Sequence, residues 1–286
     1  MTEYILETKD LVFKYTGDKV LNEISVQIEK GKKTVFLGEN GAGKSTLFLH
    51  FNGILKPNKG KIFFKGGEVK YDLASLKKLR KSVGIVFQDP DTQLFSASVY
   101  QEVSFGLMNL GFPREKAEKY VDYALEATGT SSLRDKPTHS LSYGQKKRVT
   151  IASIIAMEPE VIIFDEPTNY LDPKHKIQII GFLDELNKNG TTVILSTHDV
   201  DIAYPWADNI FVMKDGNILK HGSPEEIFSD LKVLDSTNLI SPMILDIYNE
   251  LKRKGCVSPD IPFPRSKTEL VECIIKSACY TGGNSK

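Results

Sequence analysis

Short stretches in which hydrophobic and polar residues alternate open the chain and predict a strand-rich N-terminal part. The alternation is clearest at Leu11, Phe13 and Tyr15, and it returns in the segment from Ile24 to Ile28. A period of two residues is typical of β-strands that bury one face. We therefore expect an antiparallel β subdomain between residue 3 and about residue 29.

Mainly hydrophobic runs that alternate with helical patterns predict a parallel sheet in the middle of the chain. The expected strands are Thr34–Leu37, Val83–Phe87, Val161–Phe164 and Thr192–Ser196, and a further strand is expected at Lys61–Phe64. The expected helices run from about Gly43 to Asn52, from Leu73 to Lys81 and from Pro173 to Asn189. Alternation of strand and helix implies parallel strands with crossover helices, and Asp215-Gly216 marks a hairpin after them.

Between about residue 95 and residue 157 helical periodicity replaces this alternation. Helices are expected at Val99–Asn109, at Arg114–Thr128 and from Ser142, as N-cap, to a stop before Glu158. This segment is predicted to be a helical insert in an α/β core. Past residue 223 prolines separate short helical patterns, so we divide the chain into a main domain, residues 1–223, and a small C-terminal appendage, residues 224–286.

Charge balance and the length of the hydrophobic stretches argue against some classes of protein. The 286 residues carry 37 Lys plus Arg and 37 Asp plus Glu, which gives no support for a nucleic-acid partner. The longest clearly hydrophobic stretch, Ile151 to Met157, is far too short to cross a bilayer, and the N-terminus has no signal-peptide pattern. We expect a cytoplasmic protein whose membrane role, if any, comes through a partner.

Three cysteines, Cys256, Cys273 and Cys279, lie near the C-terminal end. Their odd number and the absence of a C-x-x-C spacing argue against a disulfide framework. We expect them to serve packing rather than metal binding or redox sensing.

A glycine-rich loop between an expected strand and an expected helix is the first candidate site. The segment from Gly38 to Ser45 fits G-x-x-x-x-G-K-[ST], a pattern whose backbone N–H groups surround phosphates. Lys44 is expected to neutralise the β- and γ-phosphates, and Ser45 to offer a hydroxyl to Mg²⁺. The expected contacts of ATP in this loop are Gly38, Asn40, Gly41, Gly43, Lys44, Ser45 and Thr46.

Two acids follow the hydrophobic strand at Val161–Phe164. The end of a buried strand is where an α/β sheet presents ligand-binding groups. With a phosphate loop in the same chain, we expect Asp165 to orient hydrated Mg²⁺ and Glu166 to polarise the attacking water.

The pentapeptide from Leu141 to Gln145 predicts a second anion site. Ser142 at a helix N-cap, followed by Gly144, offers a hydroxyl, free N–H groups and the positive end of a helix dipole. A chain that already holds one phosphate site has little use for a second unless it serves the nucleotide of another subunit.

These motifs, in this order, resemble those of ATP-binding-cassette (ABC) ATPases over residues 1 to about 222. The resemblance implies a P-loop NTPase fold and adds further site residues. Tyr15 is expected to stack on adenine, Gln88 to touch the metal, and Gln145 to complete the signature. Asp172 belongs to the D-loop, and His198 is expected to contact the γ-phosphate.

The pattern departs from the common family motifs at two places. Tyr143 stands where the signature usually has glycine, which restricts backbone approach there. Asn169-Tyr170 stands where the D-loop usually begins Ser-Ala, which leaves its contacts across the subunits open.

A narrower resemblance is to the ATPases of energy-coupling-factor importers, including those for cobalt and nickel. The segment from Gln88 to Phe95, Tyr143 and the segment from Gly222 to Phe228 carry it. It implies a second ATPase subunit, identical or different, a transmembrane coupling subunit and a substrate-binding membrane protein. The chain would act at the cytoplasmic face of the membrane, with the appendage helping to hold two ATPases together. Leu94 and Phe95 either form a docking groove for a membrane subunit or pack under the insert.

Other functions stay open at this point. A vitamin is the alternative to cobalt or nickel as cargo. A chromosome-maintenance ATPase would need a long coiled-coil insertion before Leu141, and translation ATPases usually carry two cassettes in one chain. A non-catalytic ATP-binding regulator is a third alternative, against which the presence of Glu166 and His198 argues.

Overall fold

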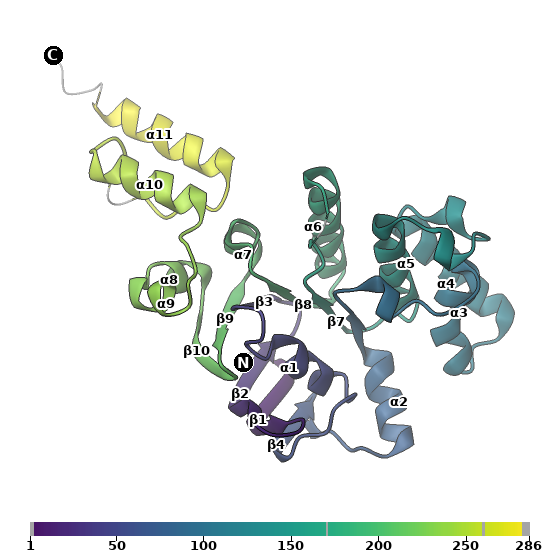
Figure 1. Ribbon diagram of the computed structural model, residues 1–286. Coiled ribbons are helices and arrows are strands. Elements are labelled where there is room, and N and C mark those ends of the chain that lie inside the picture. The colour runs from purple at the N-terminus through teal and green to yellow at the C-terminus, as the bar shows by residue number, and fades with distance from the viewer. Residues whose placement is uncertain (1–2, 170, 259–260, 282–286) are drawn as a thin grey trace.

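A computed structural model describes residues 3–169, 171–258 and 261–281 of the chain. Within these residues the strands form a four-stranded antiparallel sheet and a six-stranded, mainly parallel sheet (Figure 1). The antiparallel sheet has the order β2-β1-β4-β5. Its strands are β1 (Tyr4–Lys14), β2 (Lys19–Glu29), β4 (Lys59–Phe64) and β5 (Gly67–Glu68). The N-terminal antiparallel subdomain predicted from alternation is therefore present.

The second sheet has the order β10-β9-β3-β8-β7-β6. Its strands are β3 (Lys33–Leu37), β6 (Val83–Val86), β7 (Val161–Asp165), β8 (Thr192–Thr197), β9 (Asn209–Lys214) and β10 (Asn217–Gly222). All neighbours pair in parallel except β9 and β10, which form the predicted hairpin. Asp215 and Gly216 in its turn both have positive φ, as a tight hairpin turn requires.

The sheet lies between two hydrophobic clusters because its strand side chains alternate in direction. On β3, Val35 and Leu37 point into one cluster, and Phe36 points into the other. The second cluster also contains Phe48 and Phe51 of the helix α1 (Lys44–Phe51). Burial on both faces fixes the carboxyl ends of β3, β7 and β8 side by side at one edge.

The helical insert lies beside the sheet, at the right of Figure 1. It contains α3 (Val99–Asn109), α4 (Arg114–Ala127) and α5 (Tyr143–Ile155), which match the helices predicted from periodicity. Three further helices flank the sheets, namely α2 (Leu73–Ser82), α6 (Pro173–Lys188) and α7 (Val200–Trp206). The sequence pattern did not reveal α7, a short helix that contains Pro205.

The C-terminal part contains α8 (Pro224–Phe228), α9 (Leu231–Ser236), α10 (Met243–Arg253) and α11 (Lys267–Thr281). The α8 helix packs on α7 through the rings of Phe228 and Tyr204, whose centroids are 5.6 Å apart. The α10 and α11 helices pack on each other at the end farthest from the helical insert (Figure 1).

The expectation that the cysteines serve packing holds for one of them and is wrong for another. Cys273 is buried in the main hydrophobic cluster, whereas Cys256 is exposed because it follows the turn that ends α10. The side chain of Cys279 lies outside the described residues. Among the helices described, we find none long and hydrophobic enough to span a membrane.

Candidate active site

The glycine-rich loop connects β3 to α1 and is wedged against neighbouring strands. Gly38 has φ 148°, and a Cβ there would lie 2.2 Å from the carbonyl oxygen of Met213. Gly43 has φ 102°, and its Cβ would lie 2.9 Å from Cδ2 of Leu21. Both positions therefore require glycine, and the close fit holds the loop at the carboxyl end of β3.

Lys44 lies buried beneath this loop. Its Nζ donates hydrogen bonds to the carbonyl oxygens of Gly38, at 2.6 Å, and Glu39, at 3.0 Å. Burial lowers the pKa of the Lys44 ammonium, while the nearby charges of Glu166 and Asp165 act in the opposite direction. The loop thus holds a positive charge close to two carboxylates.

A cavity of about 300 Å³ opens above the loop. It is lined by Val20, Asn40, Gly41, Gly43, Lys44, Ser45, Thr46, Gln88, Asp165 and Glu166. Three separate motifs, from the phosphate loop, the end of β6 and the end of β7, therefore meet in one place. The hydroxyl-bearing residue Ser45 is exposed there.

Ser196 links Asp165 and Glu166, a role that was not predicted from the sequence. It lies opposite Asp165 in the β7–β8 register, and its Oγ donates a 2.5 Å hydrogen bond to Asp165 Oδ1. The same Oγ accepts a 2.9 Å hydrogen bond from the backbone N–H of Glu166. The position just before Thr197-His198 was the available signal, but the residue that Ser196 faces depends on strand register.

Glu166 combines burial with an unsatisfied carboxylate. Its side chain is 3% exposed, and among the described residues neither carboxylate oxygen has a hydrogen-bond partner. Its backbone has φ 46°, which is uncommon for a residue other than glycine. A buried carboxylate without donors is costly, so groups of this kind tend to serve a function. Here the oxygens can accept a hydrogen bond from water.

His198 follows β8 and lies beside Glu166. Its Nδ1 is 3.2 Å from Glu166 Oε2, an approach without the direction of a hydrogen bond, and its side chain is 59% exposed. Tyr15, 55% exposed, lies at another margin, with its OH 3.4 Å from Thr46 Oγ1. Both predicted residues are therefore at the edge of the cavity rather than in its lining.

The residues predicted to form the signature, Ser142, Gly144 and Gln145, lie outside the cavity at Lys44. Ser142 caps α5, its Oγ accepting from Gln145 N at 3.4 Å and its N–H donating to Gln145 Oε1 at 3.0 Å. Gly144 lines a separate hollow of about 330 Å³, together with Leu171 and His175. None of these is among the described residues that line the cavity at Lys44.

Asp172 caps α6, next to the signature hollow. Its carboxylate accepts hydrogen bonds from His175 N, at 3.0 Å, and His175 Nδ1, at 2.5 Å. These hydrogen bonds lower the pKa of Asp172. Tyr170, which with Asn169 forms the atypical start of the D-loop, lies outside the described residues.

The segment at Gln88 is tied to α5 through its backbone. Lys147 Nζ donates to the carbonyl oxygens of Phe87, at 3.0 Å, and Gln88, at 2.7 Å. Tyr143 OH donates to the Gln88 carbonyl at 3.3 Å. Burial lowers the pKa of Lys147 to about 8, although nearby carboxylates raise it. No role for Lys147 was predicted from the sequence.

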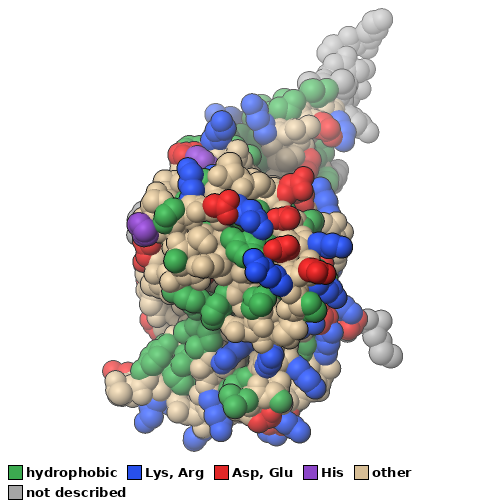
Figure 2. All heavy atoms as spheres, turned by 90° about the vertical axis from the view of Figure 1, so that its right-hand side faces the viewer, with side chains coloured by type: hydrophobic (Ala, Val, Ile, Leu, Met, Phe, Trp, Pro, Cys, Tyr) green, Lys and Arg blue, Asp and Glu red, His purple; other side chains and the backbone are tan. Residues whose placement is uncertain are grey.

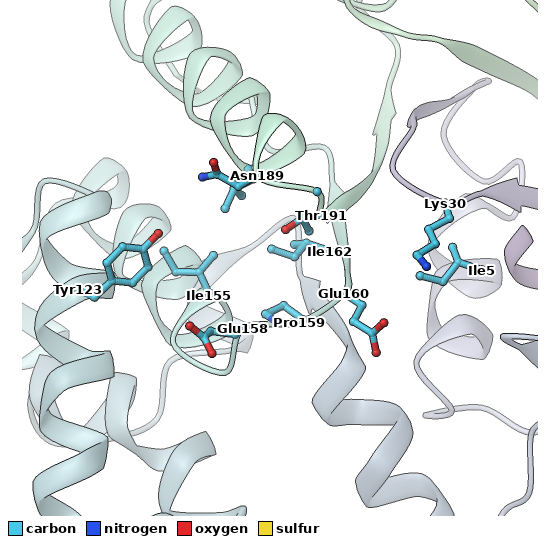
Figure 3. A pocket seen from close by; sticks show the side chains of 12 residues that line it. Ile5, Lys30, Tyr123, Ile155, Glu158, Pro159, Glu160, Ile162, Asn189 and Thr191 are labelled. Carbon is cyan, nitrogen blue, oxygen red and sulfur yellow. The ribbon is translucent and has the colours of Figure 1, made fainter. Parts of the chain in front are cut away.

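Another hollow, of about 340 Å³, lies at the opposite edge of the sheet, where β7 and β8 begin. Figure 3 shows that its lining comes from distant elements, with Tyr123 on the helical insert at one side and Lys30 at the other. Because α/β sheets bind ligands at the carboxyl ends of their strands, we assign the chemistry to the cavity at Lys44.

The proteins that this chain resembles in sequence are ATP-binding transporter subunits, which agrees with a nucleotide site in this cavity. Residues 21–169 match the family model described as ABC transporter. The chain is 52% identical to the energy-coupling factor transporter ATP-binding protein EcfA of Methanocaldococcus jannaschii, over 88% of this chain and 90% of that protein. It is 49% identical to EcfA3 of Clostridium perfringens, over 89% of this chain and 90% of that protein.

Solved structures of ATP-binding cassettes superpose on this chain. CbiO1 from Clostridium perfringens, part of the ABC transporter complex CbiONQ, superposes with a TM-score of 0.73 at 48% identity, covering 88% of this chain and 99% of CbiO1. A dimeric ATP-binding cassette in a post-hydrolysis state with ADP and phosphate superposes with a TM-score of 0.71 at 26% identity. The match covers 77% of this chain and 99% of that cassette. The chain belongs to the ABC transporter family, as an ATP-hydrolysing member of its energy-coupling-factor branch.

Proposed function

We propose that this chain powers an energy-coupling-factor importer by closing on a second ATPase subunit around ATP and reopening after hydrolysis. The observation that carries the proposal is the buried carboxylate of Glu166, whose oxygens accept no hydrogen bond from the described residues, in the cavity that also contains Lys44. An acceptor for water and a cation for phosphate, held on rigid elements, suit phosphoryl transfer to water.

The residues fit a magnesium nucleotide. Ser45, Gln88 and Asp165 line the cavity with hydroxyl, amide and carboxylate oxygens, the hard ligands that Mg²⁺ prefers. Mg²⁺ usually keeps several waters and is held by one or two carboxylates together with substrate phosphates, an arrangement that the carboxylate of Asp165 in this cavity suits. When bound, Mg²⁺ neutralises charge on the phosphate oxygens.

Hydrolysis on this proposal depends on positions more than on covalent chemistry. Lys44 would turn from the carbonyls of Gly38 and Glu39 toward the β- and γ-phosphates. Glu166 would accept a hydrogen bond from the attacking water and orient it in line with the γ-phosphate. His198, at the exposed margin beside Glu166, would contact the γ-phosphate.

The second subunit would supply the signature. Ser142 and Gly144 lie at the N-terminus of α5, outside the cavity of their own subunit. Apart from the adjoining residues and backbone of the same helix, no atom of the described residues lies within 4 Å of a Cβ built on Gly144. We propose that this open helix end faces the γ-phosphate held by the partner's phosphate loop, with Asp172 nearby at the subunit contact.

The membrane partner would dock on the exposed side chain of Phe95, in the segment that follows Gln88, and on exposed hydrophobic residues of α3. Leu94, the other residue considered for this groove, is instead partly buried against the main hydrophobic cluster. Phe95 is 64% exposed and packs edge-on against Phe105, with ring centroids 4.7 Å apart, and Met108 is also exposed. Figure 2, which looks onto the helical insert, shows hydrophobic side chains gathered toward the lower left of the view, with charges of both signs most frequent on the right. A helix of a transmembrane coupling subunit suits this surface, and would place the chain at the cytoplasmic face of the membrane.

The appendage, residues 224–286, would help to hold the two ATPases together. Met243 and Ile247 of α10 and Ile275 of α11 are exposed hydrophobic residues on this helix pair. For the cargo we propose cobalt or nickel ions, with a vitamin as the alternative. The similarity to CbiO1 and to the EcfA proteins supports this branch of importers.

Purification of the chain from native membranes tests the proposal. We expect a second ATPase subunit, a transmembrane coupling subunit and a substrate-binding membrane protein to co-purify. The metal or vitamin retained by the last of these identifies the cargo. Recovery of the chain with ribosomes or chromosomal proteins, and without membrane proteins, would contradict the proposal.

A further inference from the structure

We propose that Lys147 and Tyr143 are positioning residues that hold the backbone of Gln88, so that its side chain stays at the nucleotide site. The inference rests on the proposed role of Gln88 at the metal. It gives a specific task to Tyr143, the residue by which the signature departs from the common pattern. Both residues lie on the first two turns of α5, the helix whose N-terminus would serve the other subunit.

The contacts of Lys147 are those of a fixed support. Its side chain is among the largest fully buried ones, with the residue 1% exposed. A buried ammonium is costly unless it is hydrogen-bonded, and here two consecutive carbonyls, of Phe87 and Gln88, accept from it. The nearby carboxylates of Asp165, Asp89 and Glu166 also favour the charged form. Lys147 therefore binds one side of the segment, while Gln88 lines the cavity.

Tyr143 adds a second donor to the same carbonyl. Its OH lies 3.3 Å from Gln88 O, and a glycine at this position has no side chain to make the contact. Lys146, one turn along, forms a 2.6 Å ion pair with Asp91. The first turns of α5 thus contact the segment from Phe87 to Asp91 at three successive points.

Other contacts fix the rest of the segment. The Gln93 side chain accepts from Phe87 N at 2.9 Å and donates to Ile85 O at 3.1 Å. Glu102 on α3 accepts from Phe95 N, at 3.1 Å, and Ser96 N, at 2.8 Å. With both flanks anchored, the peptide at Gln88 is the part whose orientation depends on α5. A change there would turn the side chain that Gln88 presents to the cavity.

A double-mutant cycle tests this directly. Lys147→Met and Tyr143→Phe are each measured alone and combined with Gln88→Ala, with Tyr123→Phe on α4 as the matched control. The readout in the full chain is the Mg²⁺ concentration that gives half-maximal ATP hydrolysis. Tyr143→Phe should raise it by about two- to tenfold, the factor expected for one lost hydrogen bond, and Lys147→Met, which loses two, should raise it by at least as much. Each should change it little further when Gln88 is already Ala. The control should leave it unchanged.

Hydrogen exchange of the nucleotide-free protein gives a second readout that does not depend on activity. In Lys147→Met and Tyr143→Phe the amides of Gln88, Asp89 and Asp91 should exchange faster, while those of β7 should keep the wild-type rate. If Lys147→Met does not fold, Tyr143→Phe, which removes a single hydroxyl, still tests whether α5 positions the backbone of Gln88.

The outcomes separate the two proposals. If Gln88→Ala hydrolyses ATP as the wild type does, the proposed role of Gln88 fails and this inference fails with it. If Gln88→Ala is impaired but the effects of the α5 variants add fully to it, or exchange of the amides of Gln88, Asp89 and Asp91 is unchanged, only the positioning role is overturned.

Discussion

Ser196 on β8 donates a 2.5 Å hydrogen bond to Oδ1 of Asp165 on the neighbouring strand β7, and its Oγ accepts the backbone N–H of Glu166. One fully buried hydroxyl thus sets the direction of an acid and the backbone of the next residue. Since Glu166 has a positive φ, this N–H contact helps to hold an uncommon backbone conformation at the candidate base.

Ser196→Ala should therefore affect both stability and turnover. It leaves a buried N–H and a carboxylate oxygen without their partner, which we expect to cost about 1–3 kcal/mol of unfolding free energy. Turnover should fall more than the affinity for ATP, because the phosphate loop is untouched. Urea unfolding and steady-state ATP hydrolysis measure the two effects. Ser153→Ala, whose hydroxyl bonds only within α5 in the described contacts, is the control. Unchanged stability of Ser196→Ala would refute this account.

The contact of β6 with α5 makes a prediction about packing. A Cβ on Gly84 would lie 2.3 Å from Cγ2 of Ile154, so Gly84→Ala should destabilise the protein by about 1–3 kcal/mol. In an Ile154→Ala background the same change should cost clearly less, because the obstructing atom is gone. The four unfolding free energies of this cycle give the coupling. Additive effects would show that Ile154 is not what requires glycine at this position.

The Asp172 carboxylate that caps α6 predicts how the free energy of unfolding depends on pH. Hydrogen bonds from His175 lower the folded-state pKa of Asp172 below its ordinary value of 3.8. The stabilisation by the charged carboxylate is therefore fully present above pH 3.8 and is lost as the pH falls through the folded-state pKa.

Comparison of the wild type with Asp172→Asn tests this sign. Asn can still cap the helix but carries no charge. The stability that the charged carboxylate adds to the wild type should shrink as the pH falls below 3.8, and the difference in unfolding free energy between the two proteins should shrink with it. A difference that grows as the pH falls below 3.8 would contradict the assignment.

The sequence predicted those parts of the site that depend on local order along the chain. The phosphate loop, Gln88, Asp165 and Glu166 each follow a hydrophobic strand, and the carboxyl ends of parallel strands share one edge. Their meeting in one cavity follows from that rule. Ser142 was likewise readable as an N-cap because capping is a matter of neighbouring residues.

The supporting residues could not be predicted in the same way. Ser196 faces Asp165 because of strand register, and Lys147 reaches Gln88 because the helical insert packs against the end of β6. Both relationships join segments that are far apart along the chain. A buried lysine also contradicts the usual tendency of its residue type, so only its partners explain it. The exposure of Cys256 depends in the same way on where α10 ends.

The central claim is that Glu166 activates water in a site that two subunits complete. The direct measurement is the mass of Glu166→Gln in solution with ATP and Mg²⁺, taken together with its turnover. We predict an ATP-dependent dimer whose turnover is lower than that of the wild type by about a hundredfold or more. Glu160→Gln, at the opposite edge of the sheet, should hydrolyse ATP as the wild type does. A Glu166→Gln protein that stays monomeric with ATP and hydrolyses it at the wild-type rate would contradict the account.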